Sequence, residues 1–169
     1  MEPSEVSYSE KQRFRQRWLW MLLLIFPVGS LWALCQEIIL GSVFGSNAES
    51  IPVLFVLVVI SAMFTLFMYT TGLDTEVVEE GLRIRFWPFH LNWMLFPFSS
   101  ILKAEAVTYS PLAEYGGWGI RYGRKGKAYN VSGNKGVLLT FKDHKNVLIG
   151  SQNHETLFLA IYERTQSSD

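Results

Sequence analysis

Two long apolar segments decide how this chain is organised: WLWMLLLIFPVGSLWALCQEIIL at Trp18–Leu40 and IPVLFVLVVISAMFTLFMYT at Ile51–Thr70. At a helical rise of about 1.5 Å per residue they would be roughly 34 Å and 30 Å long, enough to cross a hydrocarbon core of about 30 Å. Core helices of soluble proteins seldom run so far without a polar face, and the second segment has no charged residue. We therefore predict a membrane-spanning helical hairpin over residues 18–70.

The charges beside the two segments predict which way the hairpin faces. Four basic residues precede the first segment and two follow the second at a distance, while the connecting loop carries Glu49 and no lysine or arginine. Because basic residues are retained on the cytoplasmic side, both termini should face the cytoplasm, in a multi-pass protein of the cell membrane. The basic residues are Lys11, Arg13, Arg15 and Arg17 before the hairpin and Arg83 and Arg85 after it.

Composition narrows the classes of function. Fifteen basic and fifteen acidic residues balance to a net charge of zero, whereas a chain devoted to nucleic acid usually carries a basic surplus. Cys35 is the sole cysteine, which excludes an intrachain disulfide and a metal cluster built on thiolates. Glu37 is the one carboxylate within a predicted span. An ionisable group there is a functional hypothesis by default, but its place near the outer end favours contact with headgroup water.

Beyond the hairpin the pattern changes from helix to strand. Leu82, Ile84 and Phe86 alternate with basic residues, as a half-buried strand requires. Strands are predicted at residues 74–78, 82–87, 101–109, 128–131, 136–141 and 147–150, and an amphipathic helix at 153–164. This order of elements predicts an α+β domain over residues 71–165. We expect an antiparallel barrel or sandwich of six or seven strands, closed by a C-terminal helix. Residues 1–17 are interpreted as a cytoplasmic N-terminal segment that begins the first helix from residue 10, and residues 166–169 as a tail.

Residues 87–98, WPFHLNWMLFPF, are rich in aromatic side chains and contain two prolines, which disfavour a regular helix. Two interpretations stay open. In one, the aromatic side chains cover the core of the domain as part of a loop and a strand. In the other, Trp87, Phe89, Trp93 and Phe96 rest in the lipid interface, where amphipathic rings are favoured.

A glycine-rich block, Tyr115-Gly116-Gly117-Trp118-Gly119, precedes the last strands. Three glycines around a tryptophan predict backbone with positive φ or close packing against another segment. The stretch YSPLAEYGGWGIR, followed by AYNVSGNKGV and VLIGSQNHETLFLAI, resembles a family of small, uncharacterised prokaryotic membrane proteins in which two transmembrane helices carry a pleckstrin-homology-like (PH-like) domain. The resemblance covers residues 74–162 in detail and the hairpin in general layout. It implies a PH-like fold and a membrane-tethered topology, and it assigns no catalytic residue.

No catalytic or metal-binding pattern is recognisable in the sequence. His90, His144 and His154 do not pair at ligand spacing, and neither a phosphate-binding loop nor a nucleophile elbow occurs. We therefore expect no catalytic residue, no metal and no cofactor. One basic run lies within fifteen residues that lack an acid, and it is either a solvated loop or a contact with anionic lipid headgroups. It comprises Arg121, Arg124, Lys125, Lys127 and Lys135.

These patterns favour a non-enzymatic binding or scaffolding module that the hairpin anchors at the inner leaflet. Its expected partners are the bilayer, anionic headgroups, a membrane protein or a second copy of the chain, and not nucleic acid. A second hypothesis is an accessory subunit of a larger membrane complex, with Ser30, Ala33, Ser61 and Ala62 as close-packing surface against other spans. A third is an enzyme that acts on lipid at Glu37 or at the Tyr/Trp/Arg block.

Overall fold

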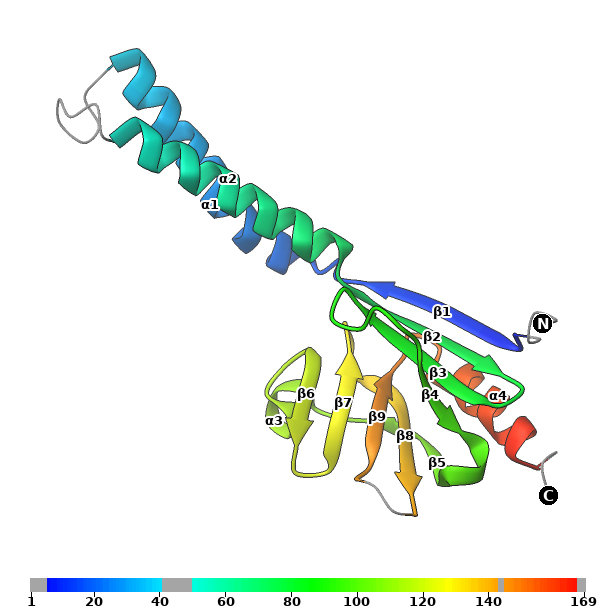
Figure 1. Cartoon of the computed structure of the whole chain (residues 1–169). Helices are drawn as coiled ribbons and strands as arrows, with labels where there is room; N and C mark the ends of the chain where they lie inside the picture. The colour runs from blue at the N-terminus through cyan, green and yellow to red at the C-terminus, as the bar shows by residue number, and fades with distance from the viewer. Residues whose placement is uncertain (1–5, 41–49, 143–144, 167–169) are drawn as a thin grey trace. The chain divides into compact units, whose positions relative to one another are not determined.

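The computed structural model describes residues 6–40, 50–142 and 145–166, and the chain divides into two compact units (Figure 1). One unit is helical and runs from Arg15 to Thr70. The other holds the sheets and combines the residues up to Phe14 with those from Thr71 onward. The predicted hairpin loop with Glu49, and also His144, lie outside the described residues. The chain therefore leaves the sheet unit after Phe14 and returns to it at Thr71.

The helical unit consists of α1 (Arg17–Leu40) and α2 (Ser50–Thr70), which pack against each other. Both are long and apolar enough to cross a membrane, and their bounds lie within one residue of those predicted. Leu34 and Leu54 are buried between the helices, whereas most other large side chains, such as Phe26 and Phe55, are exposed. The apolar surface of this unit therefore points outward.

The sheet unit contains two sheets, one of four strands and one of five. Successive side chains of each strand alternate between an inner and an outer face. The first sheet has the antiparallel order β1-β2-β3-β4 and the second has the order β5-β8-β9-β7-β6, in which β7 and β9 are parallel. The strands are β1 (Tyr8–Arg13), β2 (Gly72–Val78), β3 (Gly81–Trp87), β4 (Met94–Pro97), β5 (Ile101–Thr108), β6 (Gly119–Gly123), β7 (Gly126–Asn130), β8 (Lys135–Phe141) and β9 (Val147–Gly150). The helices are η1 (Phe98–Ser100), α3 (Pro111–Tyr115) and α4 (His154–Gln166).

The main core of the sheet unit joins the inner faces of both sheets to α4. Leu82, Ile84 and Phe86 of β3 belong to it, and so do Leu157 and Ile161 of α4, all at most 1% exposed. Helix α4 packs against β5, β8 and β2, so the predicted C-terminal helix does cover the sheets. A second, smaller cluster lies around Tyr109 and Tyr115. The predicted α+β class is confirmed.

The segment before the first span differs from its prediction. Residues 8–13 form β1, which pairs with β2 from Tyr8↔Val77 to Arg13↔Gly72, so the predicted helix over residues 10–17 is wrong up to Arg13. The inward side chains of β1 include Glu10 and Gln12, which are polar. The Nε2 of Gln12 donates to the Gly150 carbonyl at 2.7 Å. Because this strand lacks apolar alternation, its sequence carries no strand signal.

The finer description of the domain also needs correction. The described residues of the sheet unit form nine strands rather than six or seven, one strand pair is parallel, and the two sheets do not close into a barrel. Strands β1 and β6 and helix α3 are missing from the prediction, and β4 lies within residues 87–98, where one of the two open interpretations included a strand. Strands β4 and β6 contain only four and five residues and carry proline or glycine, so periodicity could not reveal them.

Candidate functional site

The glycine-rich block forms a turn that joins α3 to β6. Gly116, Gly117 and Gly119 have φ values of 72°, 127° and 115°, which confirms the predicted positive φ. Gly116 ends α3, where its N–H donates to the carbonyls of Leu112 and Pro111. The Nε1–H of Trp118 donates to the Gly133 carbonyl at 2.9 Å. These contacts give the block a structural role as a connection held in a left-handed conformation.

A buried polar network holds this turn, and its central residue was not singled out from the sequence. Asn130 is fully buried; its Oδ1 accepts from the Gly119 N–H at 2.9 Å and its Nδ2 donates to the Tyr109 hydroxyl at 2.9 Å. Burial raises the pKa of Tyr109, although the Asn130 contact works against that rise. Tyr109 also meets the edge of the Tyr115 ring at 5.8 Å between centroids. The network satisfies polar groups in the interior and presents none of them to a ligand.

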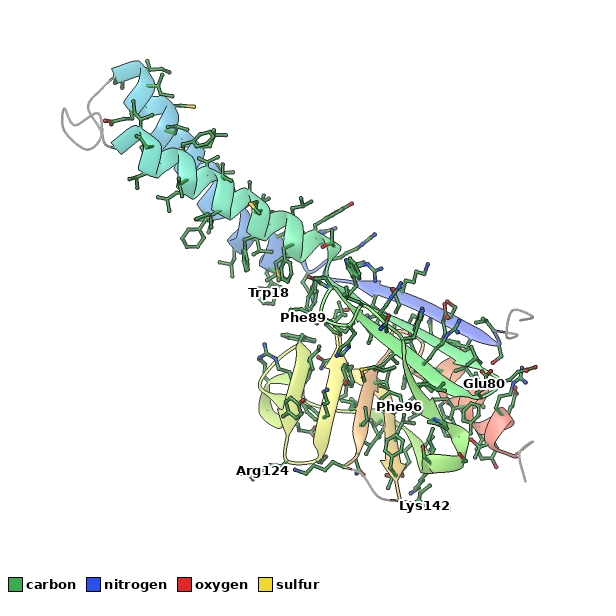
Figure 2. The ribbon with its side chains drawn as sticks, in the orientation of Figure 1. Trp18, Glu80, Phe89, Phe96, Arg124 and Lys142 are labelled. Carbon is green, nitrogen blue, oxygen red and sulfur yellow. The ribbon has the colours of Figure 1, made fainter. Side chains whose placement is uncertain are left out.

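The five residues of the predicted basic run do not form one surface. Lys127 pairs with Val147 at the start of β9, whereas Lys135 lies beyond the Gly136↔Gly150 pair at the other end of that strand. Arg124 and Lys125 occupy the β6–β7 turn, and Arg124 lies near the same end of the sheet as Lys142 (Figure 2). These basic residues are close in sequence but not in space, because the chain between residues 121 and 135 runs from one end of the sheet to the other.

Three of these five side chains are engaged within the sheet unit. Lys125 forms an ion pair with Glu114 at 2.7 Å, and this contact raises the pKa of Lys125. The Nε of Arg121 donates to the Trp118 carbonyl at 2.9 Å. The Nζ of Lys127 lies 5.2 Å and 4.6 Å from the ring centroids of Tyr122 and Tyr129. Arg121 and Lys127 also lie on opposite faces of their hairpin, since Arg121 faces Ala128 across it and Lys127 faces Tyr122.

A second basic cluster, which we call the arginine ladder, lies on the outer face of the first sheet and consists of Arg13, Arg83 and Arg85. Asp74 is 2% exposed. One of its carboxylate oxygens forms an ion pair with Arg13 at 2.7 Å, and the other forms one with Arg85 at 3.0 Å. Burial by itself would raise the pKa of Asp74, but the two guanidinium groups outweigh it and lower that pKa.

The rest of the arginine ladder is also paired. Arg83 binds Glu76 at 2.6 Å, and the guanidinium groups of Arg83 and Arg85 lie 5.0 Å and 4.8 Å from the centroid of the Trp93 ring. The Trp93 ring, which is half-buried, is thus held by cation–π contacts with both arginines. The sequence showed the alternation of Arg83 and Arg85 but not the buried carboxylate opposite them, because Asp74 reaches them through strand pairing.

The four aromatic residues of the two open interpretations separate into two pairs. Phe96 is half-buried against the core, 5.7 Å from the Phe141 ring, and Trp93 lies under the arginine ladder. Trp87 and Phe89 are exposed, as is Leu91 beside them, at 37%, 59% and 69%. The first interpretation therefore describes Phe96, and the second concerns Trp87 and Phe89.

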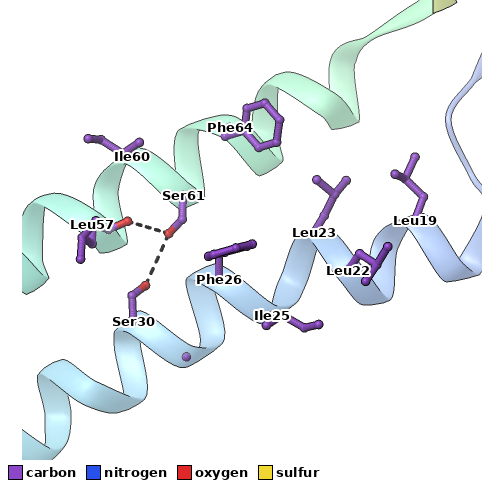
Figure 3. A pocket seen from close by; sticks show the side chains of 11 residues that line it. Leu19, Leu22, Leu23, Ile25, Phe26, Ser30, Leu57, Ile60, Ser61 and Phe64 are labelled. Atoms are coloured by element: carbon purple, nitrogen blue, oxygen red, sulfur yellow. Dashed lines mark hydrogen bonds between the residues drawn. The ribbon is translucent and has the colours of Figure 1, made fainter.

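The helical unit contains a hollow of about 620 Å³ that is almost entirely apolar (Figure 3). Its lining includes Phe26, Gly29 and Ser30 of α1 and Ser61 and Phe64 of α2. The Ser61 hydroxyl donates to the Leu57 carbonyl at 2.7 Å. The Ser30 hydroxyl lies 3.2 Å from the Pro27 carbonyl oxygen and 3.5 Å from the Ser61 hydroxyl oxygen, and it can donate its one hydrogen to either. These two predicted packing residues thus face each other inside the hairpin.

Cys35 and Glu37 lie about one and a half and two helical turns beyond Ser30, the last residue of α1 that lines this hollow. Glu37 is 6% exposed, so the predicted contact with headgroup water does not describe its position in the helical unit. Cys35 is exposed. Among the residues that the structure describes, no group of three or more histidine, cysteine, aspartate or glutamate side chains could hold a metal ion.

Comparison of the chain with protein-family models and with curated proteins finds no match. The resemblance to the prokaryotic two-helix family, the PH-like fold and the absence of catalytic activity therefore stay predictions. What the geometry establishes is two apolar helices and an α+β unit of two sheets.

Proposed function

We propose that this protein is a membrane-anchored, non-enzymatic binding module, whose hairpin spans the bilayer and whose sheet unit stands at the inner leaflet. The observation that carries the proposal is the outward-facing apolar surface of α1 and α2. Phe26, Ile39 and Met63 are 74%, 76% and 65% exposed, and α2 carries no charged residue. Apolar surface on this scale would be unfavourable in water, while a bilayer accepts it and requires helices of this length.

The orientation within the proposal follows from charge. Basic residues flank the two ends of the hairpin that connect to the sheet unit, and the positive-inside rule places such residues in the cytoplasm. The sheet unit would then bind a membrane protein, lipid or a second copy at the inner leaflet. The basic run at residues 121–135 is divided between two ends of a sheet. We therefore do not propose that this run contacts lipid headgroups as one surface.

Membrane fractionation of cells that express the full chain tests the anchor. We expect the chain to stay in the membrane pellet after washes with high salt and alkaline carbonate, and to dissolve only in detergent. A C-terminal tag should resist protease in intact cells and be cleaved after permeabilisation. A chain that is monodisperse in buffer without detergent, or a tag cleaved in intact cells, would contradict the proposal.

The binding role is tested by cross-linking the full chain in native membranes and identifying the attached proteins and lipids. An unrelated two-span protein of the same topology serves as the matched control for random contacts. We expect at least one protein or lipid that the control does not recover. Recovery of the same set by both proteins would contradict a dedicated binding role.

One observation favours the accessory-subunit hypothesis as a second candidate. The apolar hollow between α1 and α2 is open beside Gly29, where an added Cβ would meet no atom within 4 Å. A span of another subunit could pack there, since small residues allow close approach of helices. In that case Gly29→Leu should release co-purifying subunits in mild detergent. Val28→Leu, at an exposed position outside the hollow, should not.

A further inference from the structure

The loop between β3 and β4 presents an uncharged apolar surface on the sheet unit. From Phe86 to Leu102 the chain contains no aspartate, glutamate, lysine or arginine. Trp87, Phe89 and Leu91 point outward at 37%, 59% and 69% exposure, and Figure 2 labels Phe89 on this loop. We call these three side chains the loop triad. A soluble domain rarely gathers aromatic and aliphatic side chains on one exposed loop unless the loop binds something.

The position of the loop triad in the sheet is set by strand pairing. Trp87 pairs with Gly72 across β2 and β3, and Gly72 in turn pairs with Arg13 at the end of β1. Gly72 follows Thr70, the last residue of α2, by two residues. With about 3.8 Å per peptide unit and about 5 Å between paired strands, the Cα of Trp87 lies within about 13 Å of the Cα of Thr70. This limit follows from two peptide links and one strand pair, and it holds at any angle between the two units.

The loop is also held in one conformation before any partner arrives. The N–H of His90 donates to the Phe86 carbonyl at 2.8 Å, and the Phe89 ring lies 6.1 Å from the Phe86 ring. The His90 ring packs against Tyr129 at 5.8 Å. Burial and the nearby Lys127 lower the pKa of His90, which keeps this side chain neutral at physiological pH. An ordered loop binds with little loss of conformational entropy.

We propose that the β3–β4 loop is a second membrane contact, in which Trp87, Phe89 and Leu91 enter the headgroup–acyl boundary of the leaflet that α2 leaves at Thr70. The proposal rests on the proposed membrane anchor. It selects the bilayer as the occupant for two reasons. The covalent chain and the strand pairing keep Trp87, at the start of the loop, within about 13 Å of the last residue of α2. Tryptophan, phenylalanine and leucine are also side chains that this boundary favours. Arg15 before α1 and Arg17 at its first position, both exposed, would meet anionic headgroups on the same side.

The test uses fluorescent labels on the full chain reconstituted in vesicles of phosphatidylcholine and phosphatidylglycerol. In a Cys35→Ser background, an environment-sensitive fluorophore is attached to Phe89→Cys and, separately, to Leu91→Cys. Leu112→Cys on α3, 67% exposed, is the matched control in the sheet unit, and Met63→Cys, 65% exposed on α2, reports on the anchor. Each label is exposed to aqueous iodide and to lipids that carry a nitroxide near the headgroup or deep in the acyl chain.

We expect labels at 89 and 91 to be quenched by the shallow nitroxide and to show an iodide quenching constant at least about threefold smaller than the label at 112. The label at 63 should be quenched by the deep nitroxide. Iodide access at 89 and 91 equal to that at 112, with deep quenching at 63, would overturn this inference and leave the anchor standing. Absence of lipid quenching at 63 would overturn the anchor as well.

Two further controls separate the bilayer from a second copy of the chain and from misfolding. Shielding at 89 and 91 that shows no lipid quenching and disappears at a higher lipid-to-protein ratio would overturn the proposal in favour of self-association. Because Phe89 contacts the Phe86 ring, the label at Leu91 repeats the measurement at a more exposed position. Agreement between the two labels is required by the proposal, and shielding at 89 alone would contradict it.

Discussion

The helical hairpin and the sheet unit use the same side chains in opposite ways. Phe26 of α1 is 74% exposed, whereas Phe86 of β3 is 1% exposed. Leu82 and Ile84 are fully buried in the sheet unit, while Leu31 and Ile39 of the hairpin are 51% and 76% exposed. A fold stabilised in water must hide such side chains, whereas a fold in lipid has no need to. The contrast is the one that the proposed membrane anchor predicts, with one unit suited to water and the other to lipid.

The two units also treat charge differently. The sheet unit buries Asp74 but surrounds it with two guanidinium groups, and it places Glu10 against several donors at the start of α4. The described helices α1 and α2 contain a single acidic side chain, Glu37 of α1. Buried charge is tolerated where partners meet it, so the polar contacts of the sheet unit should carry measurable stability.

The largest expected difference between the two units comes from truncating one phenylalanine in each of them. Phe86→Ala leaves a cavity in the core and should lower the free energy of unfolding of the sheet unit by about 3–5 kcal/mol. Phe26→Ala should change it by less than about 0.5 kcal/mol, because that side chain does not pack in a core. Urea unfolding of the full chain in detergent, followed by near-ultraviolet circular dichroism, measures both variants. Similar losses from the two substitutions would contradict the division into two solvents.

Replacing the buried carboxylate tests whether paired charge stabilises the sheet unit. Asp74→Asn removes the charge that two arginines share and should cost about 2–3 kcal/mol in the free energy of unfolding. Glu76→Gln is the matched control on the same strand, where a single, more exposed pair with Arg83 should be worth no more than about 1 kcal/mol. Equal costs at the two positions would show that the Asp74 contacts add nothing beyond a surface ion pair.

The same carboxylate predicts a pH dependence. Because its pKa is lower in the folded state than in the unfolded chain, the stability that it contributes is complete above the unfolded value of about 3.9 and is lost as pH falls through the folded pKa. The difference in urea midpoint between the parent and Asp74→Asn should therefore be constant from pH 7 to about pH 5 and shrink below about pH 4. A difference that stays constant down to pH 2 would contradict the assignment.

A smaller effect is expected from the contacts that attach β1 to the rest of the sheet unit. The Glu10 carboxylate accepts from the Tyr8 hydroxyl at 2.7 Å, from Ser151 at 2.6 Å and from the Gln152 N–H at 2.8 Å, and so attaches β1 to the start of α4. Glu10→Ala should destabilise the sheet unit by about 1–2 kcal/mol. Lys11→Ala, an exposed neighbour on the other face of β1, should cost less than about 0.5 kcal/mol. Equal urea midpoints for the two variants would place residues 8–13 outside the sheet unit.

The smallest expected effect lies within the hairpin. Ser61→Ala removes the hydroxyl that faces Ser30 at 3.5 Å, and interhelical hydrogen bonds of this kind contribute about 0.6 kcal/mol on average. We expect a shift of that size in the unfolding of the helices by SDS in mixed micelles, followed by far-ultraviolet circular dichroism. Met63→Ala, on the exposed side of α2, should produce no shift. A loss of several kcal/mol at Ser61 would mean that the hairpin depends on a polar core.

Several features were predictable from the sequence because they depend on neighbours along the chain. The two apolar helices follow from length and composition, and six of the nine described strands follow from alternation and turn residues. The positive φ of the glycine block is predictable as well, since only glycine adopts it freely. Local periodicity is enough wherever an element buries one regular face, as β3 does with Leu82, Ile84 and Phe86.

Other features were decided only by the tertiary structure, because they join residues that are far apart in sequence. Arg13 meets Asp74 across 61 positions, and Gln12 meets Gly150 across 138. The same pairing divides the basic run between two ends of a sheet, covers Trp93 with two arginines, and leaves Trp87, Phe89 and Leu91 exposed beside the strand that follows α2. No local pattern encodes strand pairing at that range, so the partner of each polar side chain and the exposure of each aromatic ring appear only once the sheets have formed.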